Sequence, residues 1–252
     1  VGGQDRFGAT DVRWLRSDRG DPSSNEEAVA QLQVTVKDGD AAKVGRAFSR
    51  AAVELGLATY PGFAMTGPPG DSDPYAVYWP ASIPAETVEQ RVVFDDGSAL
   101  EVLLPPYKPE PSQPAPAQEP GPLDPAPTRR APLGTVAGAR SGDKGGNANL
   151  GVWGRTADGY RWLEAFLTVD RLRHLMPETA GLVVERHAFP NFAALNFVIH
   201  GLLGEGVASS TRLDPQAKTL GEYLRAKVVE VPESLLGTPD QGQPTNPRVA
   251  YS

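Results

Sequence analysis

The residues best suited to chemistry lie together in one short segment, residues 139–149. Arginine can hold a phosphate or carboxylate through two parallel hydrogen bonds, and lysine adds a point charge. Three glycines in the segment free backbone N–H groups to surround an anion. We therefore expect an anion-binding loop; the alternative is an exposed hairpin whose charges pair with one another. The candidate residues are Arg140, Ser141, Asp143, Lys144, Asn147 and Asn149.

A second polar cluster, residues 209–218, follows three glycines. Arg212 and Lys218 are candidate contacts for an anion. Asp214 precedes Pro215, a pattern typical of a helix start, so a capping role is the favoured alternative for that carboxylate.

Proton transfer has two candidates, Asp143 and His200. His200 lies four residues after Asn196 in an apolar stretch, and alternation along a strand would place both on one face. Histidine titrates near neutral pH and can act as a general acid or base, although a hydrogen-bonded structural histidine is commoner. Asn196 is a candidate ligand contact.

Composition narrows the class of function. The net charge is −7 and no block of basic residues occurs, which argues against nucleic-acid binding. No cysteine is present, and the three histidines lack metal-ligand spacing, so we expect no metal site unless carboxylates alone form one. No cofactor is indicated. The absence of an apolar run of about 18 residues or of a signal peptide predicts a cytoplasmic protein without a membrane span.

The chain is expected to have two folded parts. Residues 105–131 are dense in proline and lack apolar periodicity, which favours a tether over a docking segment. Residues 1–104 and 132–236 flank it, and residues 237–252 resemble a disordered tail in composition. Because the chain begins at Val1, we expect a fragment or a processed product.

The residue pattern of the part before the tether predicts an α+β piece. We expect a strand at 28–36, a helix capped by Asp40 and stopped near Gly56, and strands at 75–79, 88–94 and 99–104. Asp96-Gly97 indicates a hairpin between the last two strands.

The part after the tether alternates strand pairs with helices. Strands at 133–139 and 148–154 flank the glycine-rich loop, and further strands are expected at 182–189 and 194–203. Helices are expected at 160–167 and after a Thr168 cap, with a helix or helix plus strand at 220–229. This order predicts an α+β sandwich with helices on one sheet face.

Three strings carry a resemblance to a known family. They are ARSGDKGGNANLGVWGR (139–155), LNFVIHGLLGEG (195–206) and STRLDPQAKTLGEYL (210–224). In this order they resemble the C-terminal ferredoxin-fold domain of AtuA-like proteins, the acyclic terpene utilisation family. The resemblance covers 131–230 well and extends more loosely over 28–104. Gly146 departs from it, since an acidic residue is commoner there.

The resemblance implies a fold and a class of function. It implies a ferredoxin-like α/β sandwich, joined by the proline-rich linker to the α+β end of a larger N-terminal domain. It further implies catabolism of a branched or acyclic-terpenoid acyl compound, or its CoA thioester, with the missing N-terminal portion and a homo-oligomer as expected partners. The alternative is a non-catalytic accessory or oligomerisation domain, which a flat face carrying Trp153 and Trp162 would favour.

Overall fold

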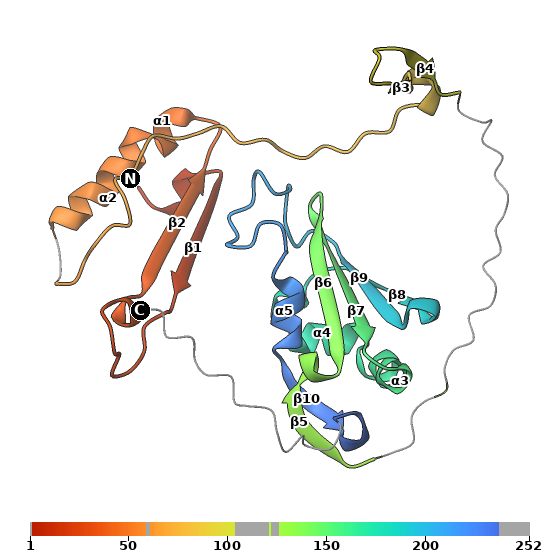
Figure 1. The fold of residues 1–252 in the computed structure, drawn as a ribbon. Coiled ribbons are helices and arrows are strands. Elements are labelled where there is room, and N and C mark those ends of the chain that lie inside the picture. The colour runs from red at the N-terminus through yellow and green to blue at the C-terminus, as the bar shows by residue number, and fades with distance from the viewer. Residues whose placement is uncertain (1, 59–60, 104–120, 122–125, 237–252) are drawn as a thin grey trace. The chain divides into compact units, whose positions relative to one another are not determined.

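The computed structural model describes residues 2–58, 61–103, 121 and 126–236 (Figure 1). The chain divides into two compact units, Val1–Ala76 and Val77–Ser252. Within the described ranges no helix is both long and apolar enough to cross a membrane. Most of the expected proline-rich tether and the expected disordered tail lie outside the described residues.

The first unit combines a two-stranded antiparallel sheet with two helices. Its elements are β1 (Ala9–Leu15), β2 (Gln31–Lys37), α1 (Ala41–Val44) and α2 (Arg46–Leu57), with short 3-10 turns at Gln4–Arg6 and Glu26–Ala28. The Asp40 cap is confirmed, because its carboxylate accepts a hydrogen bond of 3.0 Å from the Ala42 N–H. Helix α2 continues one residue past Gly56, so the expected stop was wrong by that residue.

Strand β1 was not expected from the sequence. Its polar residues Asp11 and Arg13 alternate with Val12 and Trp14, so charges interrupt the apolar pattern. The register pairs Val12 with Val34 and places one apolar face across both strands. Strand β2 begins three residues later than the expected strand 28–36, and the short 3-10 turn Glu26–Ala28 occupies the chain before it.

The second unit opens with a small hairpin of β3 (Arg91–Val93) and β4 (Ala99–Glu101). Its turn confirms the Asp96-Gly97 signal, and Gly97 adopts a φ of +81°, which glycine accepts without a steric cost. The strand expected at 75–79 is wrong. There the backbone N–H of Tyr78 instead donates a hydrogen bond of 3.0 Å to the carbonyl of Glu205.

A four-stranded antiparallel sheet organises the rest of this unit. It contains β6 (Ala137–Lys144), β7 (Asn147–Gly154), β8 (Val184–Phe189) and β9 (Ala194–Ile199), in the order β6-β7-β9-β8. Because β9 lies between them and is antiparallel to both, β7 and β8 run parallel. The connection from β7 to β8 passes through α3 (Ala157–Phe166) and α4 (Val169–Leu175), which together with both strands form a split β-α-β unit.

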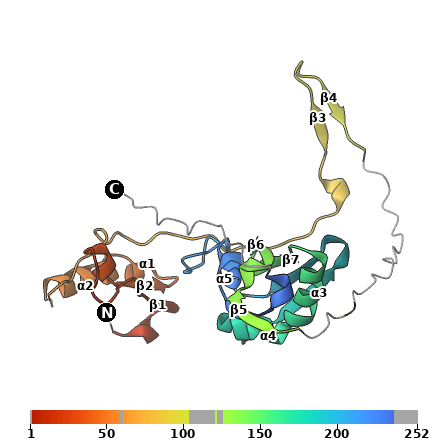
Figure 2. The same ribbon diagram turned by 60° about the horizontal axis from the view of Figure 1, so that its bottom comes forward.

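Helices cover one face of this sheet. Figure 2 shows α3 and α4 on one side of it, and α5 (Leu220–Arg225) packs near β6. Alternate residues of β7 and β9 are buried against them in a single apolar cluster. The Thr168 cap of α4 is confirmed, since its hydroxyl accepts a 3.1 Å hydrogen bond from the Arg171 N–H. The α+β architecture is therefore confirmed, with the core beneath one sheet face.

The glycine-rich segment forms strands rather than a loop. Strand β6 continues through Lys144 and β7 begins at Asn147, so only Gly145 and Gly146 make the turn. Gly145 has a φ of +64°, as a two-residue hairpin turn requires. A side chain on Gly146 would collide with the carbonyl oxygen of Gly204, so this turn has no room for an acidic residue.

A second two-stranded sheet closes the unit. Strand β5 (Thr128–Pro132) pairs with β10 (Val228–Pro232), which follows α5. The expected tether of 105–131 is therefore wrong over its last residues, which belong to the fold. A proline at the end of a strand is compatible with this pairing because only edge strands are present.

We predict that residues 126–236 fold independently and that β5 is needed for full stability. Removing β5 strips the ladder partner from β10, whose Val229 and Val231 are 7% and 0% exposed. A fragment of 126–236 should unfold cooperatively on heating. A fragment of 133–236 should melt roughly 5 °C lower or more, since about 1 kcal/mol shifts Tm by that amount in a small domain. Equal melting temperatures, or a non-cooperative transition of the longer fragment, would contradict this.

Candidate functional site

The sheet face opposite the helices carries most of the polar candidates. We call it the open face. Side chains alternate across a sheet, so the register fixes its members once the buried ones are known. Those members are Gly138, Arg140, Gly142 and Lys144 of β6; Asn147, Asn149, Gly151 and Trp153 of β7; Glu185, His187 and Phe189 of β8; and Ala194, Asn196 and Val198 of β9.

Three cations gather at the β6 edge of the open face. Arg140 and Lys144 project from β6 itself and are exposed. Lys218, just before α5, brings its Nζ to 3.5 Å from the point where a Cβ of Gly142 would lie. Within the described part of the chain, none of these three side chains has an ion-pair or hydrogen-bond partner. They are therefore free to meet an anion.

Two glycines leave the backbone bare beside these cations. The position of a Cβ on Gly142 meets only Lys218 within 4 Å. The corresponding position on Gly151 meets only the Arg140 carbonyl oxygen at 3.7 Å and Asn196 Oδ1 at 3.9 Å. Gly151 lies directly opposite Arg140 in the register. A small ligand can therefore rest on the sheet surface here.

A pair of amides borders this bare patch. Asn149 Nδ2 donates to Asn196 Oδ1 at 2.9 Å, and Asn196 Nδ2 donates to Asn149 Oδ1 at 3.0 Å. Each amide has two N–H donors, so one donor on each remains for a ligand. The mutual pairing holds both side chains in place, and an acceptor arriving at this patch meets fixed donors.

Histidines occupy the far end of the open face. His200 Nε2 lies 3.0 Å from Glu185 Oε1, and His187 Nε2 lies 3.4 Å from Glu185 Oε2. These hydrogen bonds hold the pKa of the Glu185 carboxyl below its usual range, and the bond with His200 has the larger effect. Asn196 faces His187 across the β8–β9 pairing, so the histidines adjoin the amide pair.

The sheet separates the two expected proton-transfer residues. Asp143 pairs with Ala148 in the register and shares its helix-covered face, whereas His200 contacts Glu185 on the open face. Ser141 also lies on the helix-covered face and is 9% exposed. Its hydroxyl accepts a 2.9 Å hydrogen bond from the Gly221 N–H and lies 3.4 Å from the Lys218 carbonyl, so it anchors the start of α5.

The remaining candidates hold the surrounding loops. Asn147 Oδ1 accepts a 2.9 Å hydrogen bond from the Gly201 N–H, which ties the β6–β7 turn to the chain after β9. Arg212 forms a 2.6 Å ion pair with Glu178, so its charge is already engaged. Asp214 accepts hydrogen bonds of 2.8 Å from the N–H groups of Lys218 and Thr219. It thus leads into α5, but no helix begins at Pro215.

The sequence did not single out Glu185 and His187 as site residues, and it named Trp153 only as part of a face for association. A signal for the first two existed, because they alternate along an expected strand and would share a face with Asn196 and His200 if the register were known. The sequence feature connected with Trp153 is Gly138. The indole ring of Trp153 occupies the space where a side chain at Gly138 would lie.

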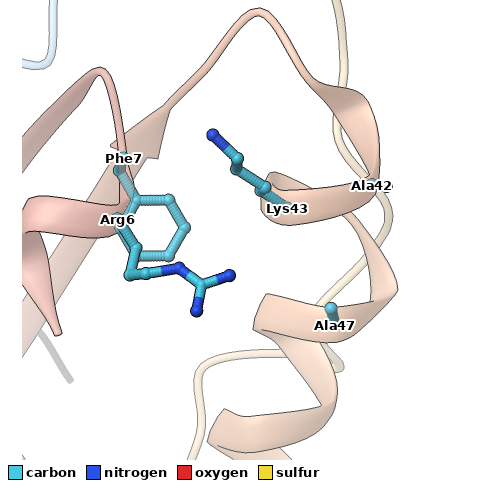
Figure 3. A pocket seen from close by; sticks show the side chains of 5 residues that line it. All are labelled: Arg6, Phe7, Ala42, Lys43 and Ala47. Atoms are coloured by element: carbon cyan, nitrogen blue, oxygen red, sulfur yellow. The ribbon is translucent and has the colours of Figure 1, made fainter. Parts of the chain in front are cut away.

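The first unit contains a separate pocket of about 370 Å³ (Figure 3). It is lined by Arg6, Phe7, Ala42, Lys43 and Ala47. Lys43 Nζ is engaged by Asp38 at 3.1 Å, which leaves Arg6 as the cation available to a ligand. None of the residues singled out in the sequence lines this pocket, whereas the open face brings several of them together.

Two family models match the chain. The AtuA ferredoxin-like domain matches residues 131–230, and the acyclic terpene utilisation family protein AtuA matches residues 2–94. No curated protein and no solved structure shows a significant match. The first match agrees with the observed sheet. The elements β6, β7, α3 with α4, β8, β9 and α5 follow one another as β-β-α-β-β-α. This is the β-α-β-β-α-β order of a ferredoxin-like fold when that order is read as a circle from its third element.

We predict that Ser141→Ala lowers stability. The change leaves the buried Gly221 N–H without its acceptor, which costs about 1–3 kcal/mol. Chemical denaturation should show that loss, with Ser234→Ala, an exposed serine in the 3-10 turn Glu233–Leu235, as the control that changes little. A Ser141→Ala variant as stable as the wild type would contradict the anchoring role.

We also predict that His200→Ala raises the pKa of Glu185 toward its ordinary value. The pKa of Glu185 is lowered in the folded state, which means that the fold favours the charged carboxylate. The charged carboxylate therefore contributes to folding stability above the unfolded-state pKa of Glu185. That contribution is lost as the pH falls through the folded-state pKa. Carboxyl NMR titration measures the shift. His174→Ala, on α4, is the control that should leave this pKa unchanged. An unaltered pKa in His200→Ala would refute the contact.

Proposed function

Because this chain belongs to the AtuA-like family of acyclic terpene utilisation proteins, we propose that its open face binds the anionic group of a branched or acyclic-terpenoid acyl compound. The ligand is the free carboxylate or its CoA thioester. The observation that carries the proposal is a group of three cations, Arg140, Lys144 and Lys218, which have no partner among the described residues and surround the bare backbone of Gly142.

The chemistry of these groups supports an anion as ligand. A guanidinium binds a carboxylate or phosphate through paired hydrogen bonds, and two ammonium groups beside it add attraction at short range. The free donors of Asn149 and Asn196 complete the set of groups around Gly151. No carboxylate side chain of the open face lies on β6 or β7; Asp143, the carboxylate of β6, belongs to the helix-covered face.

We propose His200 for proton transfer. It lies on the open face, and its bond to Glu185 orients the ring. Hydrogen bonding of the Glu185 carboxylate to Nε2 favours the tautomer with the proton on Nε2, which leaves Nδ1 as a proton acceptor. Asp143 is the weaker choice, because alternation along β6 directs it to the helix-covered face, away from the proposed ligand.

Self-association is a second candidate function. Phe189 and Phe192 are 45% and 78% exposed near the open face, and a homo-oligomer would cover them. The expected flat face carrying both tryptophans gives no support to self-association. Trp162 lies on the helix side, where its ring stacks on the ring of Phe166 of α3 with the two centroids 4.6 Å apart. Sedimentation at increasing concentration tests this role. A cytoplasmic setting, which we propose for either role, is compatible with the lack of cysteine.

The direct test of anion binding is Arg140→Ala. Isovalerate and its CoA thioester are titrated by calorimetry, and Tm is measured on the same samples. A charge-assisted hydrogen bond contributes about 1.5–3 kcal/mol net, so affinity should fall roughly tenfold or more. Because the Arg140 side chain has no partner within the described residues, Tm should change little.

Arg129→Ala is the matched control. Arg129 is an exposed arginine on β5, outside the four-stranded sheet, so the variant loses the same charge elsewhere. It should bind as the wild type does. If Arg140→Ala lowers Tm and leaves affinity unchanged, Arg140 is structural and the proposal fails.

A further inference from the structure

We propose that the open face also binds the apolar part of its ligand, so that an amphipathic carboxylate lies across the sheet with its chain over Trp153 toward Phe189. This inference rests on the proposed function, since the charged end uses the same cations. The new element is an apolar row, defined as Gly138, Trp153, Ala194 and Phe189, which the register sets side by side across β6, β7, β9 and β8.

Trp153 forms the main surface of the apolar row. A Cβ placed on Gly138 would collide with three atoms of its indole ring, so the ring lies against β6. Trp153 as a whole residue is nevertheless 40% exposed. Its indole N–H has no partner within the described residues. A flat aromatic ring held in this way offers a ligand a large contact area at little cost in side-chain entropy.

The apolar row continues beyond the ring. Ala194 is small and lies between Trp153 and Phe189 in the register, so no bulky side chain separates the two aromatics. Phe189 is 45% exposed. Neighbouring strands lie about 5 Å apart, so the surface from Trp153 to Phe189 spans roughly 10 Å. An aliphatic chain of that length can lie across it.

The cations fix the direction of the ligand. Arg140 lies two residues along β6 from Gly138 on the same face, a separation of about 7 Å. The carboxylate of a bound molecule can therefore reach Arg140 while its chain begins over Trp153. At the opposite edge Glu185 would repel a second anion. A molecule with one charged end and one apolar end fits this arrangement in a single orientation.

The experiment is a chain-length series on the full chain. Butanoate, hexanoate and octanoate are titrated against the wild type, Trp153→Ala and Trp153→Phe, with Trp79→Ala as the control for loss of an exposed tryptophan elsewhere; Trp79 is 87% exposed. For the wild type, affinity should rise roughly two- to fourfold for each methylene that packs on the face. Trp153→Ala should remove most of that increase, so that it weakens octanoate binding far more than butanoate binding. Trp153→Phe should keep most of it, and Trp79→Ala should match the wild type.

The outcomes separate this inference from the proposed function. If Arg140→Ala weakens all three ligands but Trp153→Ala leaves the chain-length dependence intact, the anion site stands and the apolar row is overturned. If Arg140→Ala binds all three as the wild type does, the proposed function itself fails. Binding to anionic phospholipid vesicles without measurable affinity for octanoate would overturn the inference in favour of a membrane surface.

Discussion

Burial of one face of β7 and β9 beneath the helices determines which side chains of the four-stranded sheet face the helices and which face away. Leu150 and Val152 of β7 and Phe197 and Ile199 of β9 are each 0% exposed. Full burial of such a side chain contributes about 1.5–3 kcal/mol relative to exposure. A slip of one residue in either strand would turn these side chains to solvent and bring Asn149 and Asn196 into the core, so the register is strongly fixed.

The open face is the consequence of that constraint. Once Leu150 and Phe197 face the helices, Asn149, Gly151 and Asn196 must face away from them, and they meet as cross-strand neighbours. Helices α3, α4 and α5 all pack on the other side, and these three residues stay partly exposed. Strands make a rigid support, and ligand groups placed on them keep their spacing better than groups on a loop. Residues far apart in sequence thereby form one surface.

The sequence predicted the local features that rest on near neighbours. The Asp40 and Thr168 caps and the Asp96-Gly97 turn depend on residues within a few positions of one another, and all three are confirmed. The α+β class followed from the alternation of strand pairs and helices. The family was identifiable from strings such as 139–155, because their polar residues and glycines occur in an unusual combination.

What escaped prediction depends on pairing between distant segments. Strand β5 has its partner about a hundred residues away in β10, and its own sequence continues a proline-rich stretch. The segment around Gly142 looked like a loop because glycines and charges normally interrupt strands, yet β7 supplies a complete ladder for it. The histidine pair with Glu185 required the β8–β9 register. Asp143 and His200 were grouped by chemistry, and only the sheet assigns them to opposite faces.

The most direct test of the open face as the binding surface is an NMR titration of side-chain N–H groups with isovalerate. The resonances of Arg140 and of the Asn149 and Asn196 amides report on the open face, and that of Arg6 reports on the separate pocket of the first unit. If the open face binds the ligand, the Arg140, Asn149 and Asn196 signals shift and saturate, and the Arg6 signal does not move. Shifts confined to Arg6 would contradict binding at the open face.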